Sequence, residues 1–203
     1  MDQALAEFIS SAASAGLRLS PEDGQRLAAG AQWLARASTA SGLSQYRDPA
    51  DALLRGMGPA LAWFRCSRLP REGLLADIGA GNGAIGATIG FFAPEMQIHL
   101  VDRARRAYTT SELLVARLGL RNVTPVLSDL AELPHSYDAV VFRALARAGE
   151  ALPCALSVAG AEAVIGAFHR RGDADFLRPA LDLTVIETVP TIVPELVLTC
   201  YRR

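Results

Sequence analysis

Lysine is absent from this chain of 203 residues, and its 20 basic residues other than histidine are all arginines. Chemistry that needs a lysine amine, such as Schiff-base formation, is therefore excluded. Cysteine is scarce: Cys66, Cys154 and Cys200 lie far apart, and no C-x-x-C pair indicates a zinc site or a redox dithiol. The formal net charge is −1, so the strongly basic character of many nucleic-acid-binding domains is also missing.

Long hydrophobic runs are missing as well, because the longest apolar runs have the length of a buried strand and cannot span a membrane. An odd number of cysteines without a secretory leader indicates the reducing cytoplasm. Hydrophobic residues make up 51% of the chain, which is enough for a sizeable core. The length suits one α/β domain with an appendage. The sequence leaves the oligomeric state open.

The N-terminal third of the chain is predicted to be helical. Apolar residues recur at helical spacing over residues 2–16. Ser20-Pro21-Glu22-Asp23 has the composition of a helix start, and this helix is expected to run to about residue 37. After a polar stretch, residues 51–66 are predicted to form a further helix that breaks near Gly56 to Pro59. Residues 1–70 are therefore expected to form a helical cap.

Short apolar segments alternate with helical patterns from residue 73 onwards. This alternation predicts a Rossmann-like, doubly wound α/β fold with a mostly parallel sheet over residues 71–203. Two successive strands at the end predict an antiparallel C-terminal edge. The expected strands are residues 74–78, 97–102, 123–127, 137–142, 161–168, 181–186 and 195–201, and the expected helices are a segment ending at residue 92, residues 110–118 and residues 148–158.

A glycine-rich loop follows the first predicted strand, in the sequence Asp77-Ile78-Gly79-Ala80-Gly81-Asn82-Gly83. Ligands of doubly wound sheets bind beyond the carboxyl ends of the strands, and glycines allow the backbone to approach a ligand closely. Gly81, Gly83 and Gly86 fit the dinucleotide pattern G-x-G-x-x-G, with Asp102 placed 21 residues after Gly81. A nicotinamide oxidoreductase is therefore one interpretation of the loop.

Acidic residues that follow the first three strands favour another ligand. Asp77 ends the first strand directly before the loop, where a carboxylate would repel a pyrophosphate. It suits the positively charged amino-acid end of S-adenosylmethionine, with Asp102 on the ribose hydroxyls and Asp129 near the adenine amino group. The adjacent Ala80, Arg103 and Leu130, together with Gly79, Gly81, Gly83 and Gly86, are assigned to the same cofactor site. The alternative is that these acids only cap helices.

The stretch from residue 77 to 146 resembles the RsmG (GidB) family of methyltransferases. The family's loop reads D-x-G-x-G-x-G-x-P-G, which is similar to the segment from Asp77 to Gly86. The basic Arg105-Arg106, the segment Leu118-Gly119-Leu120-Arg121-Asn122-Val123 and the segment Phe142-Arg143-Ala144-Leu145-Ala146 also match. The cap shows a fainter likeness at Gly42-Leu43-Ser44 and Arg47-Asp48-Pro49. The resemblance implies S-adenosylmethionine-dependent methylation of guanine N7 in small-subunit (16S) ribosomal RNA, a step of rRNA processing.

The chain departs from the family pattern at several positions on the acceptor side. Ile85 replaces the proline of the loop, and Asp129 replaces an arginine. The W-N pair of the cap is missing. The family's H-x-x-D-S motif aligns with Gly56, Pro59 and Ala60. Its lysine-glycine pair aligns near His169-Arg170, and its terminal R-H pair aligns with Pro194-Glu195. These departures leave two alternatives open: a methyltransferase of a small molecule or another macromolecule, and a non-catalytic S-adenosylmethionine-binding module.

The expected chemistry needs no dedicated general base, because guanine N7 already carries a free lone pair and placement can drive the transfer. Arg143, after the fourth strand, is predicted to be the catalytic residue and to touch cofactor and acceptor. A salt bridge to a nearby acid is the alternative.

Further acceptor contacts are predicted at five residues. Arg105 and Arg106 would contact RNA phosphates, and Arg170 would extend the basic surface. The alternative is that Arg105 and Arg106 only form the solvent-exposed first turn of a helix. Phe142 would stack on a base or pack in the core, and His169 would touch the acceptor. His135 is a candidate base by residue type alone. No spacing of histidines and cysteines indicates a metal site.

Overall fold

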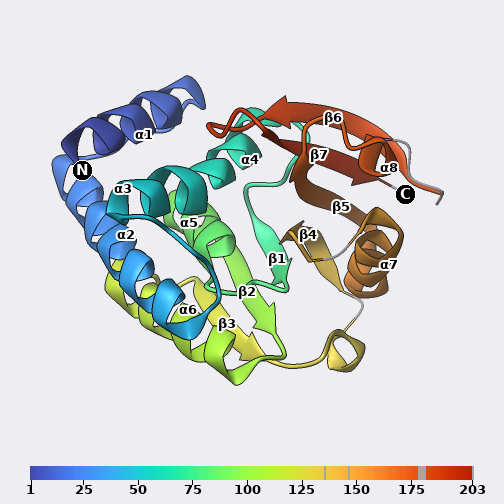
Figure 1. Ribbon diagram of the computed structural model, residues 1–203. Coiled ribbons are helices and arrows are strands. Elements are labelled where there is room, and N and C mark those ends of the chain that lie inside the picture. Colours follow the sequence, from blue (N-terminus) through green and yellow to red (C-terminus); the bar gives the residue numbers. More distant parts are fainter. Residues whose placement is uncertain (135, 146, 178–181, 203) are drawn as a thin grey trace.

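The computed structural model describes residues 1–134, 136–145, 147–177 and 182–202 of the chain. Its centre is a seven-stranded sheet with the strand order β3-β2-β1-β4-β5-β7-β6 (Figure 1). Strands β1 to β5 run parallel, and β7 runs antiparallel to both β5 and β6. The predicted doubly wound sheet with an antiparallel C-terminal edge is thus confirmed. The strands are β1 (Gly73–Ile78), β2 (Met96–Asp102), β3 (Val123–Leu127), β4 (Tyr137–Arg143), β5 (Ala159–Arg170), β6 (Thr184–Pro190) and β7 (Leu196–Arg202).

Helices cover both faces of the sheet (Figure 1). One buried cluster joins β1 and β2 to α5 (Ala84–Phe92) and α4 (Leu61–Arg65), with Val115 of α6 (Arg105–Leu118). The opposite face packs against α7 (Ala148–Val158), with Phe176 from the short α8 (Ala174–Leu177). Helix α6 begins at residue 105, five residues before the predicted start. Its first turn follows directly from the loop after β2 and carries no apolar pattern from which the start could be predicted.

The N-terminal elements form a layer outside α5 and α6. They are α1 (Asp2–Ser14), α2 (Pro21–Ser41), α3 (Pro49–Asp51), the π-helix η1 (Ala52–Met57) and the 3-10 helix η2 (Gly58–Ala60). Their buried side chains share one apolar cluster with α5 and α6, to which Ala84 and Leu114 belong. The cap is therefore packed directly onto the helices that follow β1 and β2.

Local sequence signals explain where α2 begins. The Ser20 hydroxyl accepts a hydrogen bond of 3.1 Å from the Asp23 backbone N–H, and the Asp23 carboxylate accepts one of 3.2 Å from the Ser20 N–H. This reciprocal capping satisfies two free N–H groups, and Pro21 suits the first turn. The helix runs to residue 41, four residues beyond the expected end. The predicted break near Gly56 to Pro59 is the place where the π-helix changes into the 3-10 helix.

The helices of the described segments are all too short or too polar to cross a membrane.

Candidate functional site

Three cavities adjoin one another at the carboxyl ends of the strands. The glycine-loop cavity of about 430 Å³ lies between the cap and the loop after β1. The β2–β3 cavity of about 610 Å³ lies beside the ends of those two strands. The β5 cavity of about 790 Å³ lies between the ends of β4 and β5 and the turn before β7. Ala144 lines all three, so the cavities adjoin one another at this residue.

The glycine loop has a backbone that other residues adopt only with strain. Gly79, Gly81 and Gly83 have φ angles of 65°, 58° and 79°, in the left-handed region. Gly86 is needed for a different reason, since a Cβ there would clash with the Leu100 side chain and lie 2.9 Å from Asp77 Oδ2. The sequence-predicted Gly79, Ala80 and Gly81 line the glycine-loop cavity, while Gly83 and Gly86 shape the start of α5.

Asp77 lies beneath this loop and lines the same cavity, with only 2% of its surface exposed. Its Oδ2 accepts a hydrogen bond of 2.8 Å from the Gly86 backbone N–H. Burial raises the pKa of Asp77 to about 7, and nearby Asp102 adds to this effect, although the Gly86 hydrogen bond and Arg143 oppose it. The carboxyl group is therefore poised between its two protonation states, and a cation in the cavity would favour the ionised form.

The two other predicted acids line the β2–β3 cavity together with Arg103 and Leu130. Asp102 accepts hydrogen bonds from the backbone N–H groups of Gly81, at 3.0 Å, and Ala104, at 2.8 Å. Asp102 thus ties the glycine loop to the end of β2. Asp129 accepts a hydrogen bond of 3.2 Å from the Ala131 N–H, which caps the 3-10 helix η3 (Leu130–Glu132). Asp129 is thus a helix cap that also lines the cavity.

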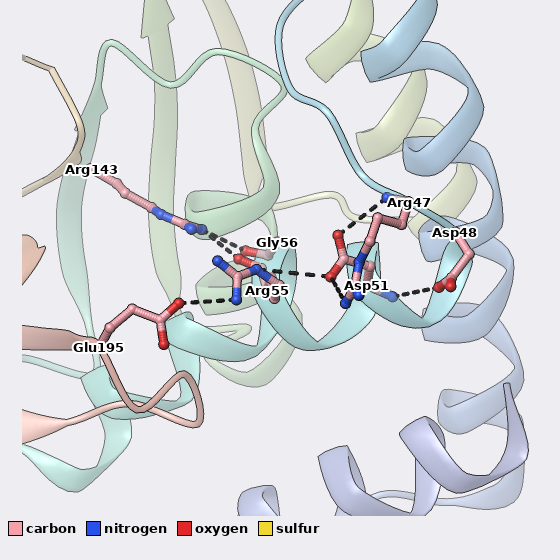
Figure 2. Close-up of polar contacts among 7 residues, drawn as sticks. All are labelled: Arg47, Asp48, Asp51, Arg55, Gly56, Arg143 and Glu195. Carbon is pink, nitrogen blue, oxygen red and sulfur yellow. Dashed lines mark hydrogen bonds and ion pairs between the residues drawn. The ribbon is translucent and has the colours of Figure 1, made fainter.

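Arg143 extends from the end of β4 towards the cap (Figure 2). Its Nη1 donates hydrogen bonds to the backbone carbonyls of Arg55, at 2.7 Å, and Gly56, at 3.4 Å. Burial lowers the pKa of Arg143, but an arginine remains charged at neutral pH. The side chain lines both the glycine-loop cavity and the β5 cavity. It therefore holds the π-helix against the site, a contact that the sequence did not reveal.

Ala144 follows directly and has a φ angle of 52°, the one positive value at a non-glycine position among the described residues. Such a conformation costs about 1–2 kcal/mol for an L-residue with a Cβ. Strained backbone of this kind clusters at functional sites. Its position where the three cavities adjoin agrees with that trend.

A chain of charged groups joins the cap to the turn before β7 (Figure 2). Glu195 Oε1 lies 3.0 Å from Arg55 Nη1, and Arg55 Nε lies 3.8 Å from Asp51 Oδ1. Asp51 is buried, and its Oδ1 accepts a hydrogen bond of 3.0 Å from Arg47 Nη2. Asp48 Oδ1 accepts a bond of 2.8 Å from the Asp51 N–H, which starts α3. Arg47-Asp48-Pro49 thus places a second carboxylate, Asp51, at the glycine-loop cavity.

Sequence reasoning missed the polar contacts between the cap and the glycine loop. Asn82 Nδ2 donates to Ser44 Oγ at 3.1 Å and to Tyr46 Oη at 3.0 Å. Gly56 allows this approach, since a Cβ there would lie 2.8 Å from Tyr46 Oη. The available signals were the asparagine within the loop and the faint likeness at Gly42-Leu43-Ser44.

Two of the predicted acceptor residues are buried. The Phe142 side chain is only 1% exposed and packs in the apolar core. It therefore does not stack on a base, contrary to the first of the two predicted alternatives. His169 is also buried, and its Nδ1 lies 2.9 Å from the Arg170 carbonyl oxygen. Because a carbonyl only accepts, Nδ1 carries the proton and Nε2 accepts from the Thr199 hydroxyl at 2.7 Å. Both ring nitrogens are engaged, so His169 lines the β5 cavity with no free base.

The predicted basic residues lie on two sides of the region. Arg170 is exposed and lines the β5 cavity with Arg171. Arg105 and Arg106 are exposed in the first turn of α6. His135 and Ala146 lie outside the described residues. Among the residues that are described, no group of histidine, cysteine, aspartate or glutamate side chains could hold a metal ion.

Solved structures with a similar fold include several methyltransferases. The ribosomal protein L11 methylase from Lactobacillus delbrueckii subsp. bulgaricus has a TM-score of 0.58 and 16% identity, with 70% of this chain and 75% of that chain covered. Precorrin-6y C5,15-methyltransferase from Geobacter metallireducens GS-15 has a TM-score of 0.52 and 17% identity, with coverage of 71% and 86%. The fold is therefore that of the Rossmann-like methyltransferase class.

The sequence comparisons identify the family within this class. The model of the GidB family, described as rRNA small subunit methyltransferase G, matches residues 24–167. The chain belongs to this family. Ribosomal RNA small subunit methyltransferase G of Chromohalobacter salexigens is 28% identical over 72% of this chain and 66% of its own length. The Shewanella amazonensis protein of that name is 26% identical over 91% and 89%. The chain aligns with only 34% of the Treponema pallidum relative, at 37% identity.

Proposed function

We propose that this chain is a cytoplasmic S-adenosylmethionine-dependent methyltransferase that modifies N7 of a guanine in small-subunit (16S) ribosomal RNA. The observation that carries the proposal is that the three cavities adjoin at Ala144, which lines each of them. Asp77 lines the glycine-loop cavity and Asp102 the β2–β3 cavity, whereas arginines outnumber carboxylates in the lining of the β5 cavity. Such an arrangement suits a cationic methyl donor beside an anionic acceptor.

The donor side fits S-adenosylmethionine by its chemistry. Bound there, the cofactor would supply an electrophilic methyl group on a sulfonium sulfur. Asp77, in the glycine-loop cavity, would hold the ammonium of the amino-acid end, which the backbone of Gly79 and Gly81 can approach closely. Asp102 would accept hydrogen bonds from the ribose hydroxyls, and Asp129 from the adenine amino group. A dinucleotide is disfavoured because Asp77 offers nothing to a pyrophosphate.

The acceptor side needs residues that position a base. Guanine N7 has a lone pair in the plane of the ring, so no proton is removed before the methyl group is transferred. This requirement agrees with a buried His169 whose two ring nitrogens are both engaged. Arg143 acts as the central positioning group, since it fixes the π-helix at the junction of the donor and acceptor cavities.

Four arginines line the β5 cavity, namely Arg55, Arg143, Arg170 and Arg171. They favour a polyanionic acceptor such as RNA even though the net charge of the chain is −1. The second candidate is a small-molecule acceptor, because a cavity of about 790 Å³ has the size of a ligand pocket. A non-catalytic module that only binds S-adenosylmethionine is the third.

Calorimetric titration tests the cofactor first. The protein and an Asp77→Ala variant are titrated with S-adenosylmethionine and, separately, with NAD. Binding of S-adenosylmethionine that the substitution weakens supports the proposal. A folded protein that binds NAD instead would indicate an oxidoreductase.

Methyl transfer tests the acceptor. The protein is incubated with radiolabelled S-adenosylmethionine and either intact small ribosomal subunits or naked small-subunit RNA, and the modified nucleoside is identified by mass spectrometry. 7-Methylguanosine is the expected product. Binding of the cofactor without transfer to either substrate would favour the small-molecule acceptor or the non-catalytic module.

A further inference from the structure

The β5 cavity contains two carboxylates in addition to its arginines. Asp173 and Glu195 both line it. A carboxylate inside a cavity that receives RNA repels the phosphates. It favours binding only where it accepts hydrogen bonds from donors on a base. Asp173 already has such a role within the protein, since its Oδ1 accepts a bond of 3.2 Å from the Asp175 N–H. Glu195 differs from Asp173 because it lies beside a guanidinium, that of Arg55, which can also donate to a base.

Glu195 pairs with an arginine from the cap. Its Oε1 lies 3.0 Å from Arg55 Nη1, and both side chains are about half exposed, at 55% and 51%. Figure 2 shows one carboxylate oxygen of Glu195 joined to Arg55 and the other turned away from it. An exposed ion pair contributes little stability, so it can open to admit a base. The hydrogen bond of Glu195 with its own backbone N–H, followed by the effects of Arg55 and Arg143, lowers the pKa of this carboxyl, which is ionised at neutral pH.

The four RNA bases differ in what they present to such a pair. Guanine alone carries two adjacent donors, N1–H and the 2-amino group, next to the acceptor O6. A carboxylate accepts the two donors side by side, and a neighbouring guanidinium donates to O6. Adenine and cytosine place an amino group where O6 would be, opposite the arginine, and uracil has a single donor.

On the basis of the proposed function, we propose that Glu195 and Arg55 are the residues that select guanine: Glu195 accepts from N1–H and the 2-amino group, and Arg55 donates to O6. N7 lies on the opposite side of the purine from the 2-amino group. N7 is next to O6, and Arg55 lines both the β5 cavity and the glycine-loop cavity, so a guanine held at O6 by Arg55 would bring N7 to the boundary of the two cavities. The pair thereby fixes both which base enters and which atom meets the donor.

The comparison of GMP with IMP tests this proposal, because IMP is GMP without the 2-amino group. The protein is saturated with S-adenosylhomocysteine, and the dissociation constants of both nucleotides are measured by calorimetry or NMR titration. The wild-type protein is expected to bind GMP roughly 10- to 100-fold more tightly, as for loss of a hydrogen bond to a charged group. In Glu195→Gln this ratio is expected to fall towards one, mainly through weaker binding of GMP.

Asp173→Asn is the matched control, since it removes the other carboxylate of the same cavity and is expected to keep the ratio. Arg55→Ala is expected to weaken GMP and IMP equally, because both carry O6. A wild-type protein that does not prefer GMP, including one that binds neither nucleotide, overturns the proposal. A Glu195→Gln variant that weakens both nucleotides equally, or a ratio that depends on Asp173, also overturns it. A methyl-transfer assay on the same wild-type preparation tests the proposed function separately.

Discussion

The carboxylate of Asp77 accepts a 2.8 Å hydrogen bond from the backbone N–H of Gly86, so the last acid of β1 is bound to the first turn of the helix that follows the glycine loop. This bond orients a buried side chain towards the glycine-loop cavity. The same contact requires glycine at position 86, where any Cβ would press on the carboxylate. The proposed cofactor contact of Asp77 and the packing of helix α5 therefore depend on the same carboxylate.

The pKa of about 7 at Asp77 predicts that a cationic ligand binds more tightly as the pH rises. Below pH 7 the carboxyl must lose a proton before it can pair with the ammonium group. The affinity for S-adenosylmethionine is therefore expected to rise by up to roughly tenfold per pH unit between pH 5 and 7 and then to level off. Calorimetry over this range checks the prediction, with Asp77→Asn as the control, whose affinity is expected to be low and flat. A steep slope in the variant would assign the effect to another group.

The same raised pKa predicts a pH-dependent gain in stability for Asp77→Asn. The unfolded chain loses the Asp77 proton near pH 4, whereas the folded chain keeps it to about pH 7. The stabilising effect of the neutral form is full below pH 4 and is lost as the pH rises to 7. The free energy of unfolding of the variant is expected to exceed that of the wild type by up to roughly 4 kcal/mol at pH 8, but hardly at pH 4. Urea denaturation at both pH values measures this difference, and an equal effect at each would contradict it.

Gly86→Ala is expected to destabilise the protein by about 1–3 kcal/mol, because the new methyl group overlaps the Leu100 side chain and crowds Asp77. Gly149→Ala is the control, since a Cβ there meets nothing within 4 Å and lies in helix α7. Alanine at that position is expected to be neutral or stabilising by up to about 1 kcal/mol. Denaturation curves of both variants give the comparison, and similar values for the two would refute the packing argument.

The backbone of Ala144 predicts opposite effects for two substitutions. Ala144→Gly relieves the strain of a φ angle of 52° but adds freedom to the unfolded chain, so its stability is expected to stay within about 1 kcal/mol of the wild type. Ala144→Val is expected to lose roughly 1–2 kcal/mol or more, because a β-branched residue tolerates this region poorly. Thermal and chemical unfolding distinguish the two, and a valine variant as stable as the glycine variant would show that the strain is absent.

Arg143→Met is expected to loosen the π-helix. The apolar stem is kept, but the carbonyls of Arg55 and Gly56 lose their donor, which costs roughly 1–3 kcal/mol. Faster amide hydrogen exchange over residues 52–57 and a fall in methyl-transfer activity are the expected readouts. Arg147→Met provides a control at an exposed arginine four residues further along. Unchanged exchange in the Arg143 variant would mean that these bonds do not hold the helix.

The parallel sheet could be predicted from the sequence because its elements are defined by local patterns. Strand β3 and helix α7 begin and end at the expected residues. The glycine loop and the acids after β1, β2 and β3 could be placed at one edge of the sheet in the same way, since the carboxyl ends of parallel strands meet there.

The acceptor side could not be predicted to the same extent, because it is assembled from segments far apart in the chain. Arg55 lies in a π-helix that no local pattern announces, and Glu195 lies in a turn 140 residues later. Arg143 donates to backbone carbonyls of the π-helix, a contact that carries no sequence signal. Which of the two alternatives holds for Phe142 could not be predicted, because residue type alone cannot tell a core side chain from one at a cavity wall.

The shared boundary at Ala144 has a consequence for inhibitor design. The cavities on either side of this residue adjoin, since each has Ala144 in its lining. A single molecule that joins an adenosine group to a purine through a short linker could fill both sides at once. Once one half is bound, the other half would be held at an effective concentration in the millimolar range for a short flexible linker. Selectivity over other proteins with this fold would then come from the purine half, because Arg55 and Glu195 belong to segments outside the parallel sheet.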